Sequence, residues 1–419
     1  MAFIAIILPL LAGGGVLWYT GVASHAAWWL LNDQPPVIEV TAPEGPQRGT
    51  VLLAVHLAPN DRASLASITV DGAPLAVPAQ APSVDIDTTT LPDGEHTVQL
   101  EAIDHSRRQN RGAVSLKIVT DNTAPTIALA GKPDRLRAGQ PAALRINVDE
   151  PADLRATWGS ETIPLIVLTP GSPSPAASPT SSGAVRTTVG LERLQGGGLS
   201  LLAILAVAPS APANDTAMRI SARDLAGNAA EIEVALPVDA PALPRQDLRV
   251  PADLAPLATG PVATEEAAQL SRLTAAITPE RQWSGAFRQP FAATYARTTG
   301  FGDRRDYADG HVVYHSGYDL AAPGGTPTLA SAAGSVVFTG ALPQRGKTVV
   351  LDHGWGVYTI YAHLLEIQVT PGQKVAAAQP VGTVGSTGLS TGPHLHWEVR
   401  LRGVPVDPNG WIALSQNLP

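Results

Sequence analysis

Apolar and polar residues alternate with a period of two along much of the chain, most clearly in two stretches of similar design. The first stretch closes with residues 97–104 and 114–118, and the second closes with residues 217–224 and 232–234. Such alternation places every second side chain on one face of a strand. A turn bounded by Asp and Asn separates the two runs in each stretch, which predicts a β-hairpin with one buried face.

Two motifs in these stretches are similar to motifs of a known family of domains. The start Asp121-Asn-Thr-Ala-Pro125 and the turn Asp224-Leu-Ala-Gly-Asn228 resemble those of bacterial immunoglobulin-like domains. Each stretch is about 90 to 115 residues long, close to the ~100 residues of such a sandwich. The resemblance implies two immunoglobulin-like β-sandwiches, over residues 35–121 and 122–238.

Two runs inside the second stretch depart from simple alternation. Residues 169–183 are rich in Pro, Ser, Thr and Ala, which predicts a disordered insertion. Residues 199–208 are apolar but too few to cross a membrane, which takes roughly 20 residues. A buried strand is therefore the better interpretation of the second run.

Residues 239–280 are predicted to form a linker and a helix. Five prolines between residues 239 and 262 indicate a semi-rigid connection. Residues 264–277 then place Leu and Ile on one helical face, with Thr264 as the expected N-cap and Pro279 as the stop. Beyond Pro290 the pattern returns to short strands and Gly-rich turns, which makes the predicted fold mostly β.

The N-terminal segment, residues 1–32, carries no Asp, Glu, Lys or Arg. Its length suits a membrane-spanning helix, and Trp28 and Trp29 suit the membrane interface. We therefore favour a retained anchor in inner-membrane lipid. A cleaved signal peptide and a buried helix stay open as alternatives, because the usual positive charge at the start is missing. Either of the first two places the rest of the chain in the cell envelope or outside the cell.

Composition excludes some kinds of site. The 419 residues exceed what one hydrophobic core holds, so several domains are expected. The chain has no cysteine, so disulfides and thiolate metal ligands are excluded. A net charge of −8 with no basic run gives no indication of nucleic-acid binding.

Six of the ten histidines lie after residue 310, and four of them fall in short clusters. His315 is followed four residues later by Asp319, His363 ends a strand-like run, and His394 and His396 are separated by one residue. On strands, His315 and Asp319 would share one face, and so would His394 and His396. The pattern predicts a groove into which four imidazoles and one carboxylate point.

Two histidines and one carboxylate leave an open position on tetrahedral zinc, as in catalytic rather than structural zinc sites. The same triad also suits Fe(II) in oxygenases. Iron chemistry would leave His363 and His394 without a role, which favours zinc.

The residues from His315 to Pro408 resemble the LytM/lysostaphin-type zinc endopeptidases, which cleave peptide bonds in bacterial peptidoglycan. The resemblance covers about 120 residues once Gly300-Phe-Gly-Asp-Arg-Arg305 is included. Its other motifs are Gly325-Thr-Pro327, Tyr361-Ala-His-Leu364, Gly385-Ser-Thr-Gly388, Ser390-Thr-Gly-Pro-His-Leu-His396 and Val406-Asp-Pro408.

The resemblance implies that residues 281–419 form a peptidase domain built on an antiparallel β-sheet, the duplicated hybrid motif. It also implies one Zn²⁺ per chain, with the ligands falling on His315, Asp319 and His396. The two non-ligand catalytic histidines fall on His363 and His394, whose individual roles stay open. Tyr307 and Tyr314 are candidates for a tyrosine of the substrate groove.

Two further interpretations stay open. Glu398 would lie on the histidine face, where it could orient His396 or His394, or form a salt bridge with Arg400 or Arg402. Residues 385–392 are expected to form a substrate-binding loop, whereas His353 is expected to shape a turn.

The sequence therefore predicts an extracytoplasmic zinc endopeptidase acting on peptidoglycan peptide stems or cross-bridges. The alternative is a non-catalytic wall-binding or hydrolase-activating protein of the same fold. The bond that is cut, the oligomeric state and the role of the two sandwiches are not determined by the sequence.

Overall fold

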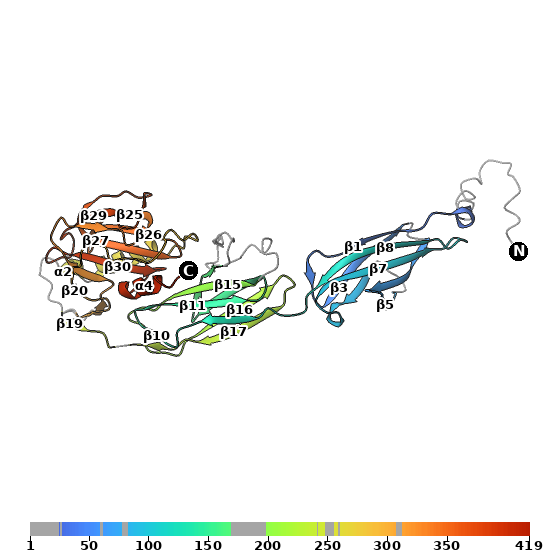
Figure 1. Cartoon of the computed structure of the whole chain (residues 1–419), viewed down its shortest axis with the longest axis horizontal. Coiled ribbons are helices and arrows are strands. Elements are labelled where there is room, and N and C mark those ends of the chain that lie inside the picture. The colour runs from blue at the N-terminus through green and yellow to red at the C-terminus, as the bar shows by residue number, and fades with distance from the viewer. Residues whose placement is uncertain are drawn as a thin grey trace. The chain divides into compact units, whose positions relative to one another are not determined.

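The computed structural model describes His25 and residues 27–58, 62–77, 83–168, 198–240, 242–247, 255–258, 260–306 and 312–419. It divides into two compact units (Figure 1), Met1–Ala124 with Leu225–Asn228, and Pro125–Asp224 with Ala229–Pro419. The predicted anchor or signal segment lies outside the described residues up to residue 24, as does the predicted insertion 169–183. No helix among the described residues is both long and apolar enough to cross a membrane.

The first unit contains a β-sandwich whose core comes from both of its sheets. Leu53, Ile86 and Leu100 are fully buried there, each on a strand that alternates buried and exposed positions. The predicted hairpin is present as β7 paired antiparallel with β8. One sheet has the order β1 (Val37–Thr41), β3 (Thr50–Ala58), β6 (Ser83–Asp87), and a short 3-10 helix, Thr88–Thr90, follows β6. The other has the order β2 (Pro46–Gln47), β8 (Arg111–Thr120), β7 (Gly94–Asp104), β4 (Ala63–Val70), β5 (Ala73–Leu75).

The second unit begins with another sandwich of two four-stranded sheets. Its predicted hairpin is present as β16 paired antiparallel with β17. One sheet has the order β14 (Leu165–Val167), β15 (Leu199–Ala206), β11 (Pro141–Val148), β9 (Ile127–Gly131). The other has the order β13 (Glu161–Ile163), β12 (Ala152–Trp158), β16 (Ala217–Asp224), β17 (Ala229–Ala235), and β10 (Leu136–Arg137) pairs with β18 (Val238–Asp239).

Strand β15 is the buried strand that the apolar run 199–208 predicts. Its odd-numbered residues, such as Leu201 and Leu205, belong to the core of the sandwich. Its even-numbered residues, such as Leu202 and Ile204, belong to the core of the C-terminal domain. The strand is apolar on both faces because both faces are covered.

The C-terminal domain is built on one large antiparallel sheet. Its main path runs β20 (Ala296–Thr299), β23 (Tyr318–Ala321), β30 (Leu395–Leu401), β27 (Val357–Ile367), β26 (Gly346–Asp352), β25 (Gly334–Leu342), β28 (Lys374–Val375). Beside it lie β24 (Pro327–Leu329), β29 (Pro380–Val384) and β31 (Val404–Val406). A small sheet joins β19 (Arg245–Asp247), β21 (Arg304–Asp306) and β22 (Val312–Tyr314). Helix α4 (Pro408–Ser415) closes the domain, with Asp407 as N-cap and proline at its first position.

The predicted helix starts and ends four residues earlier than expected. Helix α3 runs Gly260–Leu273, after the short helix α2 (Ala255–Ala258). Thr264 is not the N-cap, because its hydroxyl donates to the carbonyl of Gly260 inside the helix. Pro261 fits the first turn, where its missing N–H costs no hydrogen bond. Leu270 anchors the helix in a small core made with β25, β26 and β27.

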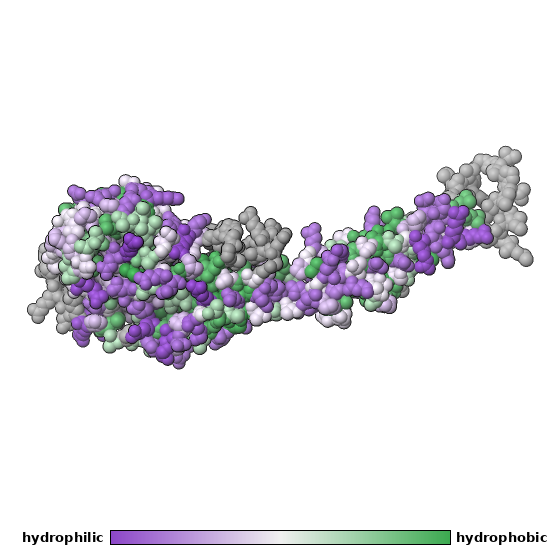
Figure 2. All heavy atoms as spheres, viewed as in Figure 1, coloured by the Kyte–Doolittle hydropathy of each residue, from purple (hydrophilic) through white to green (hydrophobic). Residues whose placement is uncertain are grey.

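The mostly β architecture confirms the predicted fold class at this level. Figure 2 shows hydrophilic and hydrophobic residues interspersed over the visible face of both units.

Candidate metal centre

Neighbouring strands bring the predicted ligands together. Strands β23 and β30 pair so that Asp319 lies directly opposite His396. Directly opposite residues in an antiparallel pair point to the same face. His315 reaches the same place differently from the prediction, because β22 ends at Tyr314 and β23 begins at Tyr318. His315 therefore lies on the connection between two strands and does not share a strand face with Asp319.

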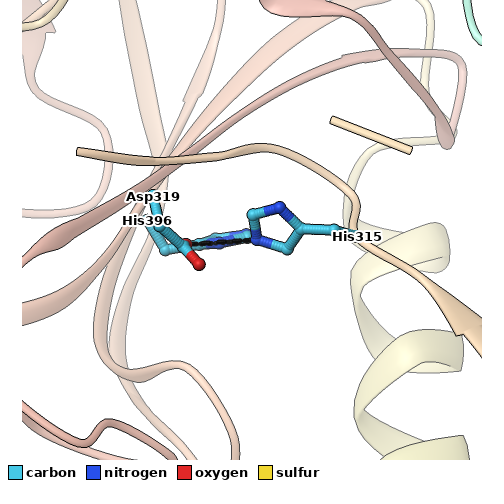
Figure 3. A group of neighbouring side chains, drawn as sticks. All are labelled: His315, Asp319 and His396. Carbon is cyan, nitrogen blue, oxygen red and sulfur yellow. Dashed lines mark hydrogen bonds and ion pairs between the residues drawn. The ribbon is translucent and has the colours of Figure 1, made fainter. Parts of the chain in front are cut away.

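One atom from each of the three predicted ligand residues lies close to the other two (Figure 3). The Nε2 atom of His315 lies 3.1 Å from Oδ1 of Asp319 and 3.0 Å from Nδ1 of His396. The Nδ1 atom of His396 lies 2.9 Å from the same Oδ1 atom. All three side chains are buried. Zinc bonds of about 2.0–2.2 Å place tetrahedral ligand atoms only slightly farther apart than this.

The protonation of the ligands suits a cation. His315 Nδ1 donates to the carbonyl of Gly300 at 2.7 Å, which leaves a lone pair on Nε2. Nε2 of His396 donates to Glu398 at 2.9 Å, which leaves a lone pair on Nδ1. Burial lowers the pKa of His315 and favours its neutral, ligating form, whereas Asp319 and Glu398 raise the pKa of His396 against the effect of burial. Two imidazole lone pairs and a carboxylate oxygen therefore face one point, an arrangement that a divalent cation stabilises.

His363 and His394 lie beside the three ligands. Each uses Nδ1 to donate to a backbone carbonyl, His363 to Thr387 at 2.7 Å and His394 to Gly392 at 2.8 Å. Their rings lie 4.6 Å apart, and His394 Nε2 is 3.8 Å from the carboxylate of Asp319. Burial, together with the charges of His396 and His394, lowers the pKa of His363 to about 3. Both imidazoles keep Nε2 as the basic nitrogen toward the site.

Strand β27 is irregular at His363, and this irregularity turns the His363 side chain toward the ligands. Ala362 lies opposite His396, so regular alternation would turn the next side chain away from that face. His363 instead has a φ of 60°, a left-handed conformation that few non-glycine residues adopt. Tyr361 and Leu364 then both enter the core, which a regular strand would not allow. The simple strand pattern predicted for His363 is wrong in this detail.

A buried charge network lies behind His396. The carboxylate of Glu398 accepts from His396 and also from Arg400 Nε at 2.8 Å and Arg345 Nε at 2.7 Å. Burial opposes ionisation, but Arg345 and Arg400 hold the pKa of Glu398 well below its usual range. Glu398 therefore fills both roles left open for it, orienting His396 and forming a salt bridge with Arg400. Arg345 was not foreseen, because it lies in no motif near the histidines.

Arg305 forms a salt bridge with Asp319, the third predicted ligand. Its guanidinium donates to Oδ2 of Asp319 at 3.1 Å, which leaves Oδ1 toward the imidazoles. Sequence reasoning included Arg305 only as part of a motif, since nothing in its spacing to Asp319 predicted the contact.

An open cavity of about 430 Å³ adjoins the ligands. His315, His396 and His363 line the cavity together with residues of helix α3. Tyr314 also lines the cavity, whereas the other tyrosine candidate, Tyr307, lies outside the described residues. The cavity gives a peptide substrate access to the proposed metal.

His353 is a buried residue of the C-terminal domain and does not belong to the group of three candidate ligands. It is fully buried, and its ring nitrogens lie 2.8 Å from the carbonyl of Ala333 and 2.8 Å from the hydroxyl of Thr359. Burial lowers its pKa to about 4, so it stays neutral at physiological pH.

Gly317 is a site residue that spacing did not reveal. A Cβ atom there would lie 2.3 Å from the carbonyl oxygen of Trp397, next to His396. We expect Gly317→Ala to push the His315 loop away from β30, destabilise the domain by about 1–3 kcal/mol and weaken zinc binding. Thermal unfolding and zinc titration measure the two effects. Gly324→Ala is the matched control, because a Cβ there meets nothing within 4 Å; equal behaviour of both variants would contradict this role for Gly317.

Two imidazoles and a carboxylate meet from β23, β30 and the loop before β23, with two more imidazoles beside them, an arrangement typical of a metallohydrolase. Residues 313–408 match the model of Peptidase family M23, and the chain therefore contains an M23 peptidase domain. M23 peptidases are zinc-dependent enzymes.

Two relatives with similar sequences are named as endopeptidases. The chain is 49% identical over 94 residues to the DD-carboxypeptidase/endopeptidase Mpg of Neisseria meningitidis, covering 22% of each protein. It is 41% identical over 133 residues to the peptidoglycan DD-endopeptidase ShyA of Vibrio cholerae, covering 32% of this chain and 30% of ShyA. The chain thus spans less than a third of the length of either relative. The solved catalytic domain of lysostaphin from Staphylococcus simulans is 30% identical, with a TM-score of 0.26, covering 28% of this chain and 92% of that domain.

Proposed function

We propose that this protein is an extracytoplasmic zinc endopeptidase that hydrolyses peptide bonds in bacterial peptidoglycan. The observation that carries the proposal is the convergence of His315, Asp319 and His396 within 3.1 Å of one another. The names of the M23 relatives supply the substrate class and favour a DD-endopeptidase.

In this proposal, His315 Nε2, Asp319 Oδ1 and His396 Nδ1 hold one zinc ion per chain. When bound, zinc would polarise the scissile carbonyl and lower the pKa of a water molecule toward ~7. Fe(II) is the competing metal for this ligand set. The two neighbouring imidazoles favour hydrolysis, and metal analysis of the purified protein decides between the ions.

His363 and His394 supply the proton chemistry. Both are held by backbone carbonyls at Nδ1, so each presents Nε2 to the reacting groups. One of them accepts the proton of the attacking water at Nε2 and, as imidazolium, passes that proton to the leaving amine when the peptide C–N bond breaks. The low pKa of His363 means that it enters the reaction as neutral imidazole. The imidazole that has taken up this proton carries an Nε2–H, which can donate to the carbonyl oxygen as negative charge develops there.

The remaining parts of the chain position this domain. We propose that residues 35–121 and 122–238 are immunoglobulin-like domains that hold the peptidase of residues 281–419 within the envelope. Segment 1–32 would anchor the chain in the inner membrane, or direct its secretion if it is cleaved. Loop 385–392, whose Thr387 carbonyl holds His363, is the proposed substrate-binding loop.

Digestion of purified sacculi tests the function. The zinc-loaded protein should release peptide-linked fragments whose new carboxyl and amine ends account for one water per cleaved bond. Mass spectrometry of the products identifies the bond, and chelator-treated protein is the control. Binding to sacculi without new ends would favour the alternative, a wall-binding or hydrolase-activating protein. New reducing sugar ends would contradict an endopeptidase altogether.

A further inference from the structure

A buried carboxylate on helix α3 approaches the metal centre from outside the matched M23 region. Glu266 is 1% exposed, although it lies in the stretch predicted as linker and helix. Leu270, one turn later, packs in the apolar cluster with Val350 and Ile360. A buried carboxylate needs charged or hydrogen-bonded partners to offset its desolvation.

Glu266 finds these partners in the turn that joins β25 to β26. Its Oε2 accepts from the backbone N–H of Gln344 at 2.5 Å. Its Oε1 accepts from the backbone N–H of Arg345 at 3.2 Å and from Nη1 of the same arginine at 2.9 Å. The carboxylate therefore fixes both the backbone of this turn and the guanidinium that leaves it.

The guanidinium of Arg345 joins Glu266 to the ligand sphere. Its Nε donates to Glu398 at 2.7 Å, and its Nη2 donates to Glu398 and, at 3.0 Å, to Ser316. Glu398 in turn accepts from Nε2 of His396 at 2.9 Å. A guanidinium held at two carboxylates keeps one orientation, whereas one held at a single carboxylate retains more rotational freedom.

The backbone of the same turn also forms hydrogen bonds to strand β27 at His363 and to the loop that contains Leu389. The N–H of His363 donates to the carbonyl of Arg345 at 2.8 Å, and the N–H of Leu389 donates to the carbonyl of Gln344 at 2.7 Å. The turn thus contacts the strand that carries one proposed proton-transfer residue and the loop beside it. Movement of this turn would shift His363 relative to the ligands.

We propose that Glu266 is a positioning residue of the active site, acting through Arg345 on His396 and through the Arg345 backbone on His363. The proposal rests on the proposed zinc peptidase function and adds a residue from the helix that precedes the M23 domain. Ala263 and Ala267 of the same helix line the cavity, so α3 forms part of the site and is not only a connector.

The test compares Glu266→Gln with Glu265→Gln in the full-length chain. Glu265 is the matched control, because it is 71% exposed and pairs with the exposed Arg272. We expect Glu266→Gln to weaken zinc binding about tenfold and to lower kcat about 10–100-fold with little change in KM. The measurements are chelator competition for zinc and steady-state cleavage of soluble wall fragments. Glu265→Gln should match the parent in both.

Several outcomes separate this proposal from its competitors. A purely structural role for Glu266 would lower the melting temperature while the folded protein kept its zinc affinity and kcat, which would overturn the proposal. If Glu266→Gln weakens zinc binding but the unsubstituted protein cleaves no wall fragment, the positioning role of Glu266 is supported and the peptidase function is rejected. Should Glu266→Gln not fold, Arg345→Lys carries the same test, because lysine cannot bridge both carboxylates. Parental zinc affinity and kcat in that variant would also overturn the proposal.

Discussion

Replacing His315 by alanine should abolish zinc binding and peptidoglycan cleavage together. Its Nε2 is one of three ligand atoms, each about 3 Å from the other two. Loss of an outer hydrogen-bond partner already costs about 10–100-fold in metal affinity, so loss of a direct ligand should cost more. Metal content after dialysis and release of muropeptides from sacculi measure the two effects in the same preparation.

The control for this variant is a histidine far from any ligand cluster in sequence. His56 is an exposed residue on β3 of the first sandwich, and His56→Ala should keep full zinc content and full activity. Retention of one zinc per chain by His315→Ala would remove this residue from the ligand set. Retained activity without His315 would reject the proposed metal site.

Replacing His363 by alanine should have a different effect, with zinc retained and most turnover lost. Its Nδ1 is bonded to the Thr387 carbonyl, and its ring stands beside the ligands without belonging to the group of three. General acid or base catalysis by one side chain contributes about 10²–10⁴-fold, so kcat should fall by that order. Steady-state kinetics on a cross-linked muropeptide dimer and zinc titration of the same variant check both parts.

The left-handed backbone at His363 calls for a second substitution. Asparagine tolerates a positive φ better than alanine, so His363→Asn separates loss of the imidazole from strain in β27. Both variants should lose turnover equally. Zinc loss in both would contradict the assignment of His363 as a non-ligand, whereas recovery of turnover in the asparagine variant would show that backbone strain caused the defect.

The fold was predictable where local pattern and burial agree. Alternation in residues 97–104 and 217–224 predicted the strands that became β7 and β16, because one face of each is buried within a single sandwich. The apolar run at 199–208 correctly predicted a buried strand. The local sequence did not show why this strand is apolar on both faces. The sandwich core covers one face of β15, and the core of the C-terminal domain covers the other.

Sequence could predict the arrangement of site residues only where those residues lie close together on one strand or in one motif. The His394–His396 spacing places both imidazoles near one face, and the resemblance to the LytM type supplied Asp319 and His315. The route of His315 was predicted incorrectly, since a loop and not a shared strand face delivers it. Helix α3 also begins earlier than its expected cap at Thr264, because Pro261 suits a first helical turn.

By itself, the sequence determined the mostly β character and the two hairpins and predicted five candidate site residues, because strand periodicity and motif spacing are local properties. Only the tertiary structure decided how those residues meet. The chain of contacts from Glu266 to His396 joins residues far apart in sequence. The positive φ of His363 and the contact of Arg305 with Asp319 also follow from no sequence pattern. Buried charges choose partners by proximity and desolvation in the folded chain, and no local pattern encodes those distances.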